Sequence, residues 1–437
     1  MSKKATVITY GCQMNVNESA KIKKIFENMG YDITENIEES DLIFLNTCTV
    51  REGAATQIYG KLGEIKPIKA KRGTIVGVTG CFAQEQGVKL AKKFPLIDIV
   101  MGNQNIGGIP NAVEKIVSGE TKHVIATDNE DELPARIDAD FESTKMASLP
   151  IMYGCNNFCT YCIVPYVRGR ERSVPMEQLL DEIKVYVQKG YKEIMLLGQN
   201  VNSYGKEFKN GDNFAKLLDE ICKLEGDFLV RFTSPHPRDF TDDVIEVIAK
   251  NPKIARAIHM PLQSGNTKVL KDMNRGYTKE DYIALAEKVK KIVPDAFLTT
   301  DIIVGFPGET EEEFLDTLDV VRKVRFGTAY MFMYSQREGT KAATMEGQIE
   351  DSVKKDRLHR LMDLQNSISK EISESYEGNE ERVLVEGPSR KNKNVLSGRT
   401  SSGKLVLFEG DESLVGEFVN IKVTDCKTWT LFGEIIK

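Results

Sequence analysis

Apolar residues along the first third of the chain fall into short runs that alternate with amphipathic stretches. A helix-like stretch near Glu18–Met29 is one of the amphipathic segments. Alternation of buried strands and amphipathic helices predicts an α/β fold with a doubly wound parallel sheet over residues 1–128. The runs rich in β-branched and aromatic residues are Ala5–Tyr10, Asp41–Asn46, Thr74–Thr79 and Ile97–Met101.

A polar, acidic stretch without periodicity follows, and it predicts a linker over residues 129–148. A second strand–helix series then begins just before Cys155. About six strand–helix units are too few for a closed eight-stranded barrel, so an open, partial (βα)6 barrel is predicted over residues 149–375. The later strand candidates are Glu193–Leu197, Phe228–Thr233, Ala255–His259, Phe297–Val304 and Thr328–Met333.

The pattern changes after Tyr376 to five short strand candidates, separated by turns such as Gly387-Pro388. Short strands with frequent turns predict a small antiparallel β-barrel over residues 376–437. From Glu371 to Lys437 the chain has nine basic and twelve acidic residues. This end therefore carries a net charge of −3 and is not a strongly basic module.

Composition and net charge limit the partners that this chain can have. Of 437 residues, 59 are Lys or Arg and 65 are Asp or Glu, which gives a net charge of −6. A polyanion such as RNA would therefore meet local basic patches rather than a general positive field. No run approaches the roughly 20 apolar residues that a membrane span needs, and the start lacks a cleavage signal. We expect a cytoplasmic monomer without a membrane partner.

Three of the eight cysteines stand within eight residues, in Cys155-Asn-Asn-Phe-Cys159-Thr-Tyr-Cys162. In a reducing compartment such cysteines bind metal or do chemistry more often than they form disulfides. Iron–sulfur clusters normally take four thiolates, so three would leave one iron open to another ligand. A structural zinc ion would need a second pair of ligands. None is near in the sequence, so we favour an iron–sulfur cluster.

Cys12, Cys48 and Cys81 are far apart in sequence, but each follows a strand candidate directly. The carboxyl ends of parallel strands lie on one edge of a sheet, where ligands bind, so the three thiols are predicted to converge. Gly11 and Gly80 precede two of them and suit tight turns. Each cysteine alone would more often be a buried apolar residue. Their repeated position favours a metal site.

The Cys155–Cys162 motif resembles the signature of the radical S-adenosylmethionine superfamily. The resemblance implies a [4Fe-4S] cluster whose open iron binds S-adenosylmethionine, which reduction cleaves to a 5′-deoxyadenosyl radical. Tyr161 resembles the aromatic residue that packs on the adenine, with a simple core aromatic as an equal alternative. Residues at later strand ends resemble the walls of the cofactor pocket, or only cap helices: Gln199, Asn200, Ser234, His236, Gln263, Ser264, Gly305 and Arg337.

The segments around the first three cysteines resemble the N-terminal domain of the methylthiotransferase family. There, three such cysteines hold an auxiliary [4Fe-4S] cluster. The end of the chain resembles a TRAM domain, a small RNA-binding barrel, so the resemblance covers nearly the whole chain. The matching segments are Gly11-Cys12-Gln-Met-Asn15, Asn46-Thr-Cys48-Thr-Val-Arg51 and Gly80-Cys81.

The segment Ile151–Ser173 is similar to the subfamily that methylthiolates C2 of N6-isopentenyladenosine beside the anticodon of tRNA. The resemblance implies radical removal of hydrogen, sulfur insertion and methyl transfer from a second S-adenosylmethionine. It implies the anticodon stem-loop as a partner, and the sequence identifies neither the electron donor nor the sulfur donor. Three alternatives stay open: action on threonylcarbamoyl-adenosine in tRNA, action on an aspartate of a ribosomal protein, and a non-catalytic iron–sulfur carrier.

Two groups of basic residues are candidates for RNA contacts. The first alternates directly after the cysteine motif and would hold phosphates, with a solvated basic loop as an even alternative. The second would form one basic face of the last domain. The first group is Arg168, Arg170 and Arg172, and the second is Arg390, Lys391 and Lys393, with Arg399 and Lys404 nearby.

Overall fold

The computed structural model describes residues 2–49, 53–128, 133–134, 136–137, 141 and 145–436. The chain forms two compact units. The first unit holds Met1–Phe141, Ser148–Asn156 and Ile163–Arg172, and the second holds Glu142–Ala147, Asn157–Cys162 and Ser173–Lys437. Much of the predicted linker, residues 129–148, lies outside the described residues.

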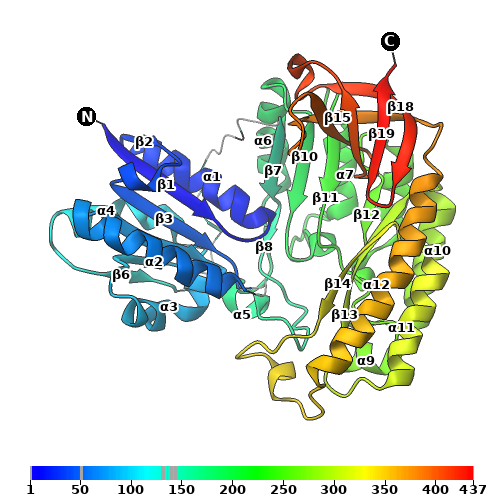
Figure 1. Ribbon diagram of the computed structural model, residues 1–437, viewed down its shortest axis with the longest axis horizontal. Helices are drawn as coiled ribbons and strands as arrows, with labels where there is room; N and C mark the ends of the chain where they lie inside the picture. Colours follow the sequence, from blue (N-terminus) through cyan, green and yellow to red (C-terminus); the bar gives the residue numbers. More distant parts are fainter. Residues whose placement is uncertain are drawn as a thin grey trace. The chain divides into compact units, whose positions relative to one another are not determined.

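The first unit is built on six parallel strands in the order β2-β1-β3-β4-β5-β6 (Figure 1). The doubly wound parallel sheet expected from the sequence is confirmed. Strands β2 and β6 escape the prediction because each has three residues and at most one of them is buried. The strands are β1 (Lys3–Thr9), β2 (Tyr31–Ile33), β3 (Leu42–Thr47), β4 (Ile75–Gly80), β5 (Ile99–Met101) and β6 (Val124–Ala126).

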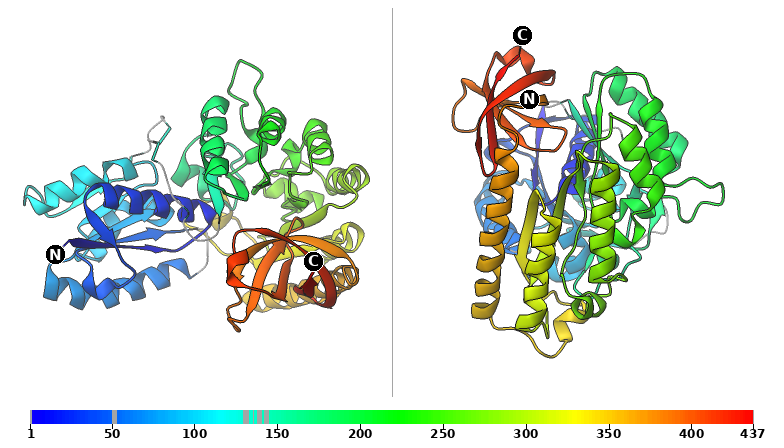
Figure 2. Two further views of the ribbon diagram at one scale, coloured as in Figure 1. Left: turned by 90° about the horizontal axis from the view of Figure 1, so that it is seen from above. Right: turned by 90° about the vertical axis from the view of Figure 1, so that its right-hand side faces the viewer.

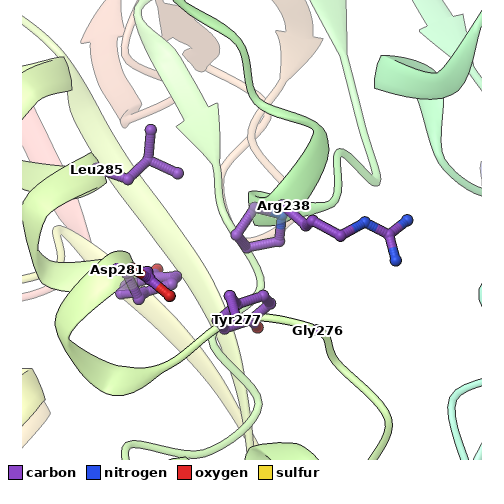
Figure 3. Close-up of a pocket in the computed structure, with 7 residues that line it drawn as sticks. Arg238, Gly276, Tyr277, Asp281 and Leu285 are labelled. Atoms are coloured by element: carbon purple, nitrogen blue, oxygen red, sulfur yellow. The ribbon is translucent and has the colours of Figure 1, made fainter.

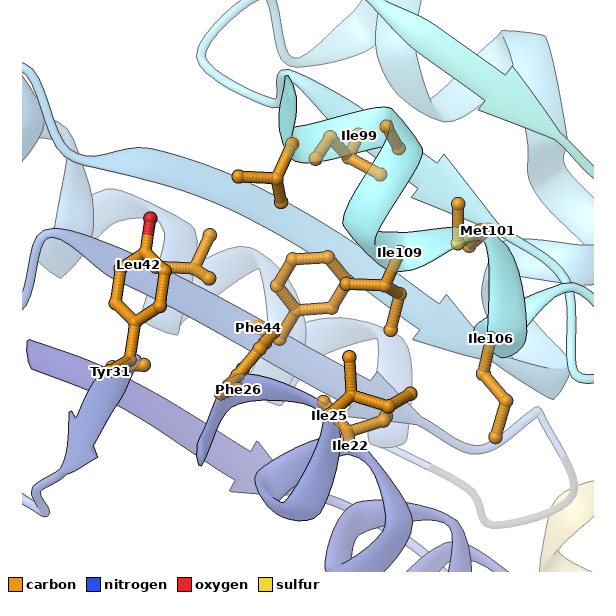
Figure 4. Packing of buried hydrophobic residues seen from close by; sticks show 13 residues of the cluster. Ile22, Ile25, Phe26, Tyr31, Leu42, Phe44, Ile99, Met101, Ile106 and Ile109 are labelled. Carbon is orange, nitrogen blue, oxygen red and sulfur yellow. The ribbon is translucent and has the colours of Figure 1, made fainter. Parts of the chain in front are cut away.

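Helices cover both faces of this sheet, and two separate hydrophobic clusters result. On one face Ile22 and Phe26 pack with Phe44, and the two phenylalanine rings meet edge-on with centroids 5.3 Å apart (Figure 4). The residue before Phe44 on β3, Ile43, points to the other face, where it packs with Leu62. Burial of each such side chain contributes about 1.5–3 kcal/mol. The helices are α1 (Gln13–Asn28), α2 (Ala54–Arg72), α3 (Cys81–Lys93), α4 (Ile109–Val117) and the short α5 (Val164–Arg168).

The second unit contains the strands of the predicted partial barrel, in two sheets of order β11-β10-β7 and β12-β13-β14. A parallel bridge between Val230 and Ile254 continues the first sheet. Between β7 and β14 no pairing exists in the described part of the chain, so the barrel is open, as expected. The strands are β7 (Met146–Pro150), β10 (Glu193–Leu197), β11 (Leu229–Phe232), β12 (Ala257–His259), β13 (Phe297–Val304) and β14 (Thr328–Met333). The short strand β8 (Met152–Tyr153), which pairs with β9 (Arg172–Ser173), belongs to the first unit.

Helices alternate with the strands of the second unit. The start of α11 is a capping box: Thr310 Oγ1 accepts from the Glu313 N–H at 3.2 Å, and the Glu313 carboxylate accepts from the Thr310 N–H at 2.9 Å. Leu361 and Ile368 lie on the buried face of α12. The helices are α6 (Met176–Gln188), α7 (Phe214–Lys223), α8 (Asp242–Lys250), α9 (Thr267–Asp272), α10 (Lys279–Ile292), α11 (Glu311–Val324) and α12 (Asp351–Glu374).

The last strands form a closed barrel of order β15-β16-β17-β19-β18 beyond the end of α12 (Figure 2). The small β-barrel is confirmed, but the expectation that every pair is antiparallel is wrong for β17 and β19, which are parallel. A closed ring of five strands cannot alternate direction throughout, so one pair has to be parallel. The strands are β15 (Glu380–Pro388), β16 (Val395–Thr400), β17 (Leu405–Glu409), β18 (Phe418–Lys427) and β19 (Thr430–Ile435).

A buried arginine joins this barrel to the strands of the second unit. Arg231 of β11 pairs with Glu193 of β10, with Nε 2.6 Å from the carboxylate. Its two terminal nitrogens donate to the carbonyl oxygens of Thr400, at 2.7 Å, and Ser401, at 2.9 Å. Thr400 ends β16 and Ser401 follows it, so the arginine fixes a turn of the small barrel against β11.

Candidate functional site

The first unit gathers Cys12, Cys48 and Cys81 at the carboxyl ends of β1, β3 and β4, which are neighbours in the sheet. Cys48 and Cys81 are buried and Cys12 is exposed. Burial raises the pKa of the Cys81 thiol to about 11, and the neighbouring Cys48 and Cys12 add to that rise. Cys81 therefore lies within electrostatic range of both other thiols, at the edge where the sequence predicts them.

Two glycines let the chain turn tightly enough to bring these cysteines together. Gly11 has a φ of +140°, and a Cβ there would lie 2.8 Å from the Cβ of Cys48. Gly80 has a φ of +94°, and a Cβ there would lie 2.2 Å from the carbonyl oxygen of Thr47. Both positions exclude any side chain, so each glycine is a requirement of the site.

Asn15 and Asn46, which belong to the matching segments of the sequence, form a hydrogen-bonded pair that connects the same turns. The Asn15 amide donates to Asn46 Oδ1 at 2.8 Å and to the Thr47 carbonyl oxygen at 3.2 Å. The Asn46 amide in turn donates to the Asn15 carbonyl oxygen at 2.8 Å. Because both side chains are fully buried, their hydrogen bonds hold α1 against the end of β3.

A buried arginine lies against the Cys81 sulfur. Arg168 Nε donates to Cys81 Sγ at 3.2 Å, and its Nη1 donates to Glu18 Oε1 at 3.0 Å. The Asn103 amide is a second donor to the same sulfur, at 3.7 Å. The prediction that Arg168 binds RNA phosphate is wrong, because its side chain is 6 % exposed and already paired with a carboxylate.

The other two arginines of this group differ from Arg168. Arg170 is exposed. Arg172 is half-buried and donates to Gln104 Oε1 and to the Arg168 carbonyl oxygen, both at 3.4 Å. A phosphate contact by Arg170 and Arg172 stays a prediction.

The residues around the first cysteine set fit an iron–sulfur cluster in their chemistry. Three thiols are soft donors that favour iron and sulfur. Arg168 Nη2 is buried and has no hydrogen-bond partner in the described part of the chain, so this site retains an unused donor suited to an anionic sulfur. Among the described residues no three His, Cys, Asp or Glu side chains lie close enough to hold one metal ion.

The second cysteine motif begins in the first unit and ends in the second. In the first unit Cys155 is buried, and its N–H donates to the Gly169 carbonyl oxygen at 3.1 Å. Gly154 has a φ of +76°, and a Cβ there would lie 1.9 Å from the Arg170 carbonyl oxygen. Glycine is therefore required directly before this cysteine.

In the second unit a buried arginine lies against Cys159. Arg275 Nη1 donates to Cys159 Sγ at 3.4 Å, while Nη2 donates to the Pro261 carbonyl oxygen at 3.1 Å. Its Nε donates to the Tyr277 hydroxyl at 3.1 Å. Sequence reasoning missed Arg275. The residues Asn274 and Gly276 on either side of it mark a turn in the sequence, and both have positive φ values, but this pattern does not indicate that Arg275 is buried.

Polar residues predicted to line the cofactor pocket meet at the ends of β10 and β11. Asn200 Nδ2 donates to Asp239 at 2.8 Å, and Asn200 Oδ1 accepts the His236 N–H at 3.1 Å. Burial lowers the pKa of His236 to about 2, and Arg275 adds to that effect, so the ring is neutral. His236 Nε2 and Gln199 Oε1 are both buried and lack partners within the described chain. Such unpaired atoms fit a polar ligand.

The other predicted pocket residues occupy strained or tightly packed positions. Ser234 and Gln263 have positive φ values of 61° and 68°, a conformation that clusters at functional sites. Gly305 follows β13, and a Cβ there would lie 2.4 Å from Lys354 Cγ. Ser264 is buried and its hydroxyl accepts the Asn266 N–H at 3.3 Å, while the cap of α9 is the side chain of Asn266.

Tyr161 and Arg337 complete the predicted set. Tyr161 packs at the edge of a cluster that contains Met273, Phe306 and Tyr334, so its ring has the surroundings of a core aromatic. Arg337 is half-buried in the turn after β14, where its carbonyl oxygen accepts from Thr340. An adenine contact by Tyr161 stays a prediction.

An open pocket lies beside the His236 and Arg275 turns (Figure 3). Arg238 and Tyr277 both line it, and Tyr277 also meets the His236 ring with centroids 5.7 Å apart. The Arg238 guanidinium donates to Asn157 Oδ1 of the cysteine motif at 2.7 Å. The pocket is lined by Pro237, Arg238, Gly276, Tyr277, Asp281, Tyr282 and Leu285.

The small barrel presents fewer basic residues than its composition suggests. Arg390, Lys391 and Lys393 are exposed between β15 and β16. Arg399 pairs with Glu386 at 2.8 Å. Lys404 does not belong to a basic face, contrary to expectation: it is buried, donates to Ser373 of α12, and has a pKa lowered to about 8 by burial.

Comparison with known proteins agrees with this layout. Residues 4–102 match the model of the Uncharacterized protein family UPF0004, residues 149–321 match the Radical SAM superfamily and residues 374–436 match the TRAM domain. A tRNA-2-methylthio-N(6)-dimethylallyladenosine synthase of Fusobacterium nucleatum is 70% identical over 99% of this chain and 100% of its own. The chain belongs to this synthase family. A synthase of the same name from Acetivibrio thermocellus is 47% identical over 98% of this chain and 90% of its own.

Solved structures share the fold of the synthase family at low sequence identity. The radical S-adenosylmethionine methyltransferase TsrM from Kitasatospora setae superposes with a TM-score of 0.58 at 15% identity, covering 78% of this chain and 77% of its own. The cobalamin-dependent radical enzyme OxsB gives 0.52 at 14% identity, covering 84% and 57%. Among the described residues, no helix is long and apolar enough to cross a membrane.

Proposed function

We propose that this chain methylthiolates C2 of the adenine ring of N6-dimethylallyladenosine in tRNA. The observation that carries the proposal is the 70% identity, over the full length of both chains, to a relative named for this activity. The presence of the cysteine domain, the radical domain and the TRAM domain in one chain supports it. Because its substrate is tRNA, we expect the protein to act in the cytoplasm.

Two [4Fe-4S] clusters belong to this proposal, one on Cys12, Cys48 and Cys81 and one on the Cys155–Cys162 motif. Three cysteines at each site leave one iron without a protein thiolate. With S-adenosylmethionine bound, the second cluster supplies a 5′-deoxyadenosyl radical able to remove the hydrogen of C2. A side-chain base would not suffice, because an aromatic C–H is not acidic enough for ordinary acid–base catalysis.

The chain's own residues orient the cofactor. His236 Nδ1 accepts the Arg238 N–H at 3.3 Å, so the proton of the neutral ring lies on Nε2. Nε2 is therefore a donor for a carboxylate or hydroxyl oxygen, and Gln199 Oε1 is an acceptor for an ammonium or hydroxyl group. S-adenosylmethionine carries all of these groups.

The RNA would be held by phosphate contacts and presented as an unpaired loop. The exposed Arg390, Lys391 and Lys393 of the small barrel are suited to phosphate, and Arg170 is a further candidate. Such contacts fix the position of an RNA but carry no sequence information. Recognition of the modified adenosine therefore depends on a base taken out of a stack, as is usual for sequence-specific RNA binding.

The test is an anaerobic reconstitution followed by reaction with tRNA that contains the dimethylallyl adenosine. We expect about eight irons per chain and a methylthio mass gain at that nucleoside by mass spectrometry. Formation of 5′-deoxyadenosine without a mass gain, but with a gain on tRNA bearing threonylcarbamoyl-adenosine, would contradict the substrate. Replacement of Cys12, Cys48 and Cys81 by alanine should leave about four irons and abolish the gain.

A further inference from the structure

A charged pair in the first unit has no part in the function proposed above. Arg168 and Glu18 are 5 % and 6 % exposed and lie next to Cys81. Burying two ions costs several kcal/mol each, and apolar residues of the same size often stabilise a fold as well or better. A gain in folding stability therefore does not explain why this pair is buried. Arg168 contacts a cysteine sulfur, which points to a role at the cysteine site.

The guanidinium of Arg168 contacts Glu18 with one edge and the Cys81 sulfur with the other. Nη1, on one side, donates to Glu18 Oε1 at 3.0 Å. Nε and Nη2 form the opposite edge of the fork, where two parallel N–H bonds are available. Nε donates to Cys81 Sγ at 3.2 Å, and Nη2 is buried without a partner in the described structure. On this edge Nη2–H can therefore donate to one further acceptor next to Cys81 Sγ.

The backbone that carries Arg168 is held in place from the sheet side. The Asn103 amide donates to the Val167 carbonyl oxygen and the Gln104 amide to that of Arg168, both at 3.3 Å. Ile163 and Val167 pack against Cys81 itself. The short helix α5 is thus fixed at both its apolar face and its last carbonyls, and the guanidinium has little freedom to leave the sulfur.

We propose that Arg168 is a positioning residue for the auxiliary cluster. Its Nε–H holds Cys81 and its Nη2–H holds a cluster sulfide. Together with Glu18, Arg168 sets the reduction potential of the cluster. The inference rests on the proposed cluster at Cys12, Cys48 and Cys81. Reduction adds negative charge, and both a positive charge and hydrogen bonds to sulfur favour the reduced state. Arg168 would therefore raise the potential, and Glu18 would lower it.

The test uses the full chain with Cys155, Cys159 and Cys162 replaced by alanine, so that only the auxiliary cluster remains. In this background we would compare R168Q, R168K and E18Q with R72Q, an exposed arginine of the same unit that pairs with Asp41. The reduced cluster is followed by electron paramagnetic resonance during a redox titration, and iron is counted.

We expect R168Q to lower the ratio of reduced to oxidised cluster about tenfold at a fixed potential, which is about 59 mV for one electron. E18Q should shift the ratio the opposite way, R168K should shift it less than R168Q, and R72Q should not move it. If R168Q loses its iron, the directions in which R168K and E18Q shift the ratio of reduced to oxidised cluster decide the test. Equal potentials for all variants, or a shift of E18Q in the same direction as R168Q or R168K, would overturn the inference. An iron-free background would overturn the cluster itself, and the inference with it.

Discussion

The two cysteine sets reach similar chemistry by different routes. Cys12, Cys48 and Cys81 come from three strand ends, 36 and 33 residues apart, and only the sheet brings them together. Cys155, Cys159 and Cys162 come from one loop of eight residues. A site of the first kind depends on the tertiary structure of its whole unit, while a site of the second kind depends on local turns.

One feature is common to both sets, and its surroundings differ. Each set has a buried arginine that donates to one cysteine sulfur, Arg168 to Cys81 at 3.2 Å and Arg275 to Cys159 at 3.4 Å. Arg168 is balanced by the carboxylate of Glu18. The other acceptors of Arg275 are a carbonyl oxygen and the Tyr277 hydroxyl, which are neutral. The second site therefore keeps a positive charge that the first site cancels.

The largest expected effect is that replacing each of the two cysteine sets abolishes different reaction products. Replacing Cys155, Cys159 and Cys162 by alanine should abolish both 5′-deoxyadenosine formation and methylthiolation. The corresponding change at Cys12, Cys48 and Cys81 should abolish methylthiolation while 5′-deoxyadenosine is still formed, because the radical motif is intact. Both products are measured by mass spectrometry in one reaction, and loss of both in the second variant would contradict the division of roles.

Removal of the positive charge at the second site should have the next largest effect. R275Q loses a charge-assisted hydrogen bond to sulfur, worth about 1.5–3 kcal/mol. We expect 5′-deoxyadenosine formed per iron to fall about tenfold to a hundredfold. R360Q removes a partly exposed arginine of α12 and is the matched control. Equal rates in the two variants would show that Arg275 only fills space.

The dependence of the first site on its sheet can be tested at a glycine. In G80A the new Cβ would meet the Thr47 carbonyl oxygen at 2.2 Å in a left-handed conformation, at a cost of about 2–5 kcal/mol. Gly73 also has a positive φ, of +72°, but open space around it, so G73A should cost about 1 kcal/mol. Urea unfolding and iron counting compare the two, and an equal loss in both would argue against steric exclusion at Gly80.

The smallest effect concerns another buried arginine–carboxylate pair, Arg357 and Glu309, which are 2.8 Å apart in the second unit. Burial raises the pKa of Glu309 from 4.5 to about 7, against the lowering effects of Gly305 N–H and Arg357. The folded state thus holds this proton more tightly than the unfolded state. The free energy of unfolding should fall by about 2 kcal/mol as the pH rises from about 4.5 to about 7.

E309Q cannot ionise, so its free energy of unfolding should lack this decline, whatever its absolute level. Urea unfolding across that pH range gives the slope, with E311Q, an exposed neighbour on α11, as the control. A slope in E309Q equal to that of the unchanged chain would assign the decline to other groups.

The sequence predicts the parts of this molecule that repeat a local pattern. Apolar runs place β1, β3, β4 and β5, and the rule that parallel strands end on one edge places three cysteines there. Strands β2 and β6 have three residues each, of which at most one is buried, and they were not predicted. The parallel pair β17–β19 follows from closing a ring of five strands, which no segment records by itself.

The misses at the candidate sites are all charged or polar side chains with distant partners. Arg168 resembles a surface arginine in the sequence, but it pairs with Glu18, 150 residues earlier. Arg275 contacts Cys159, 116 residues earlier. Such pairs arise only when two turns meet in space, so their burial could not be deduced from spacing, composition or charge.

The burial of Lys404 has a consequence for how RNA affinity should respond to salt. Each phosphate neutralised on a single strand releases counterions and contributes about −0.7 to the slope of log affinity against log salt concentration. The three exposed residues Arg390, Lys391 and Lys393 would give about −2, whereas a count including Arg399 and Lys404 would give about −3.5. A cation committed to Ser373 of α12 holds the barrel to its own chain and has no counterion to release.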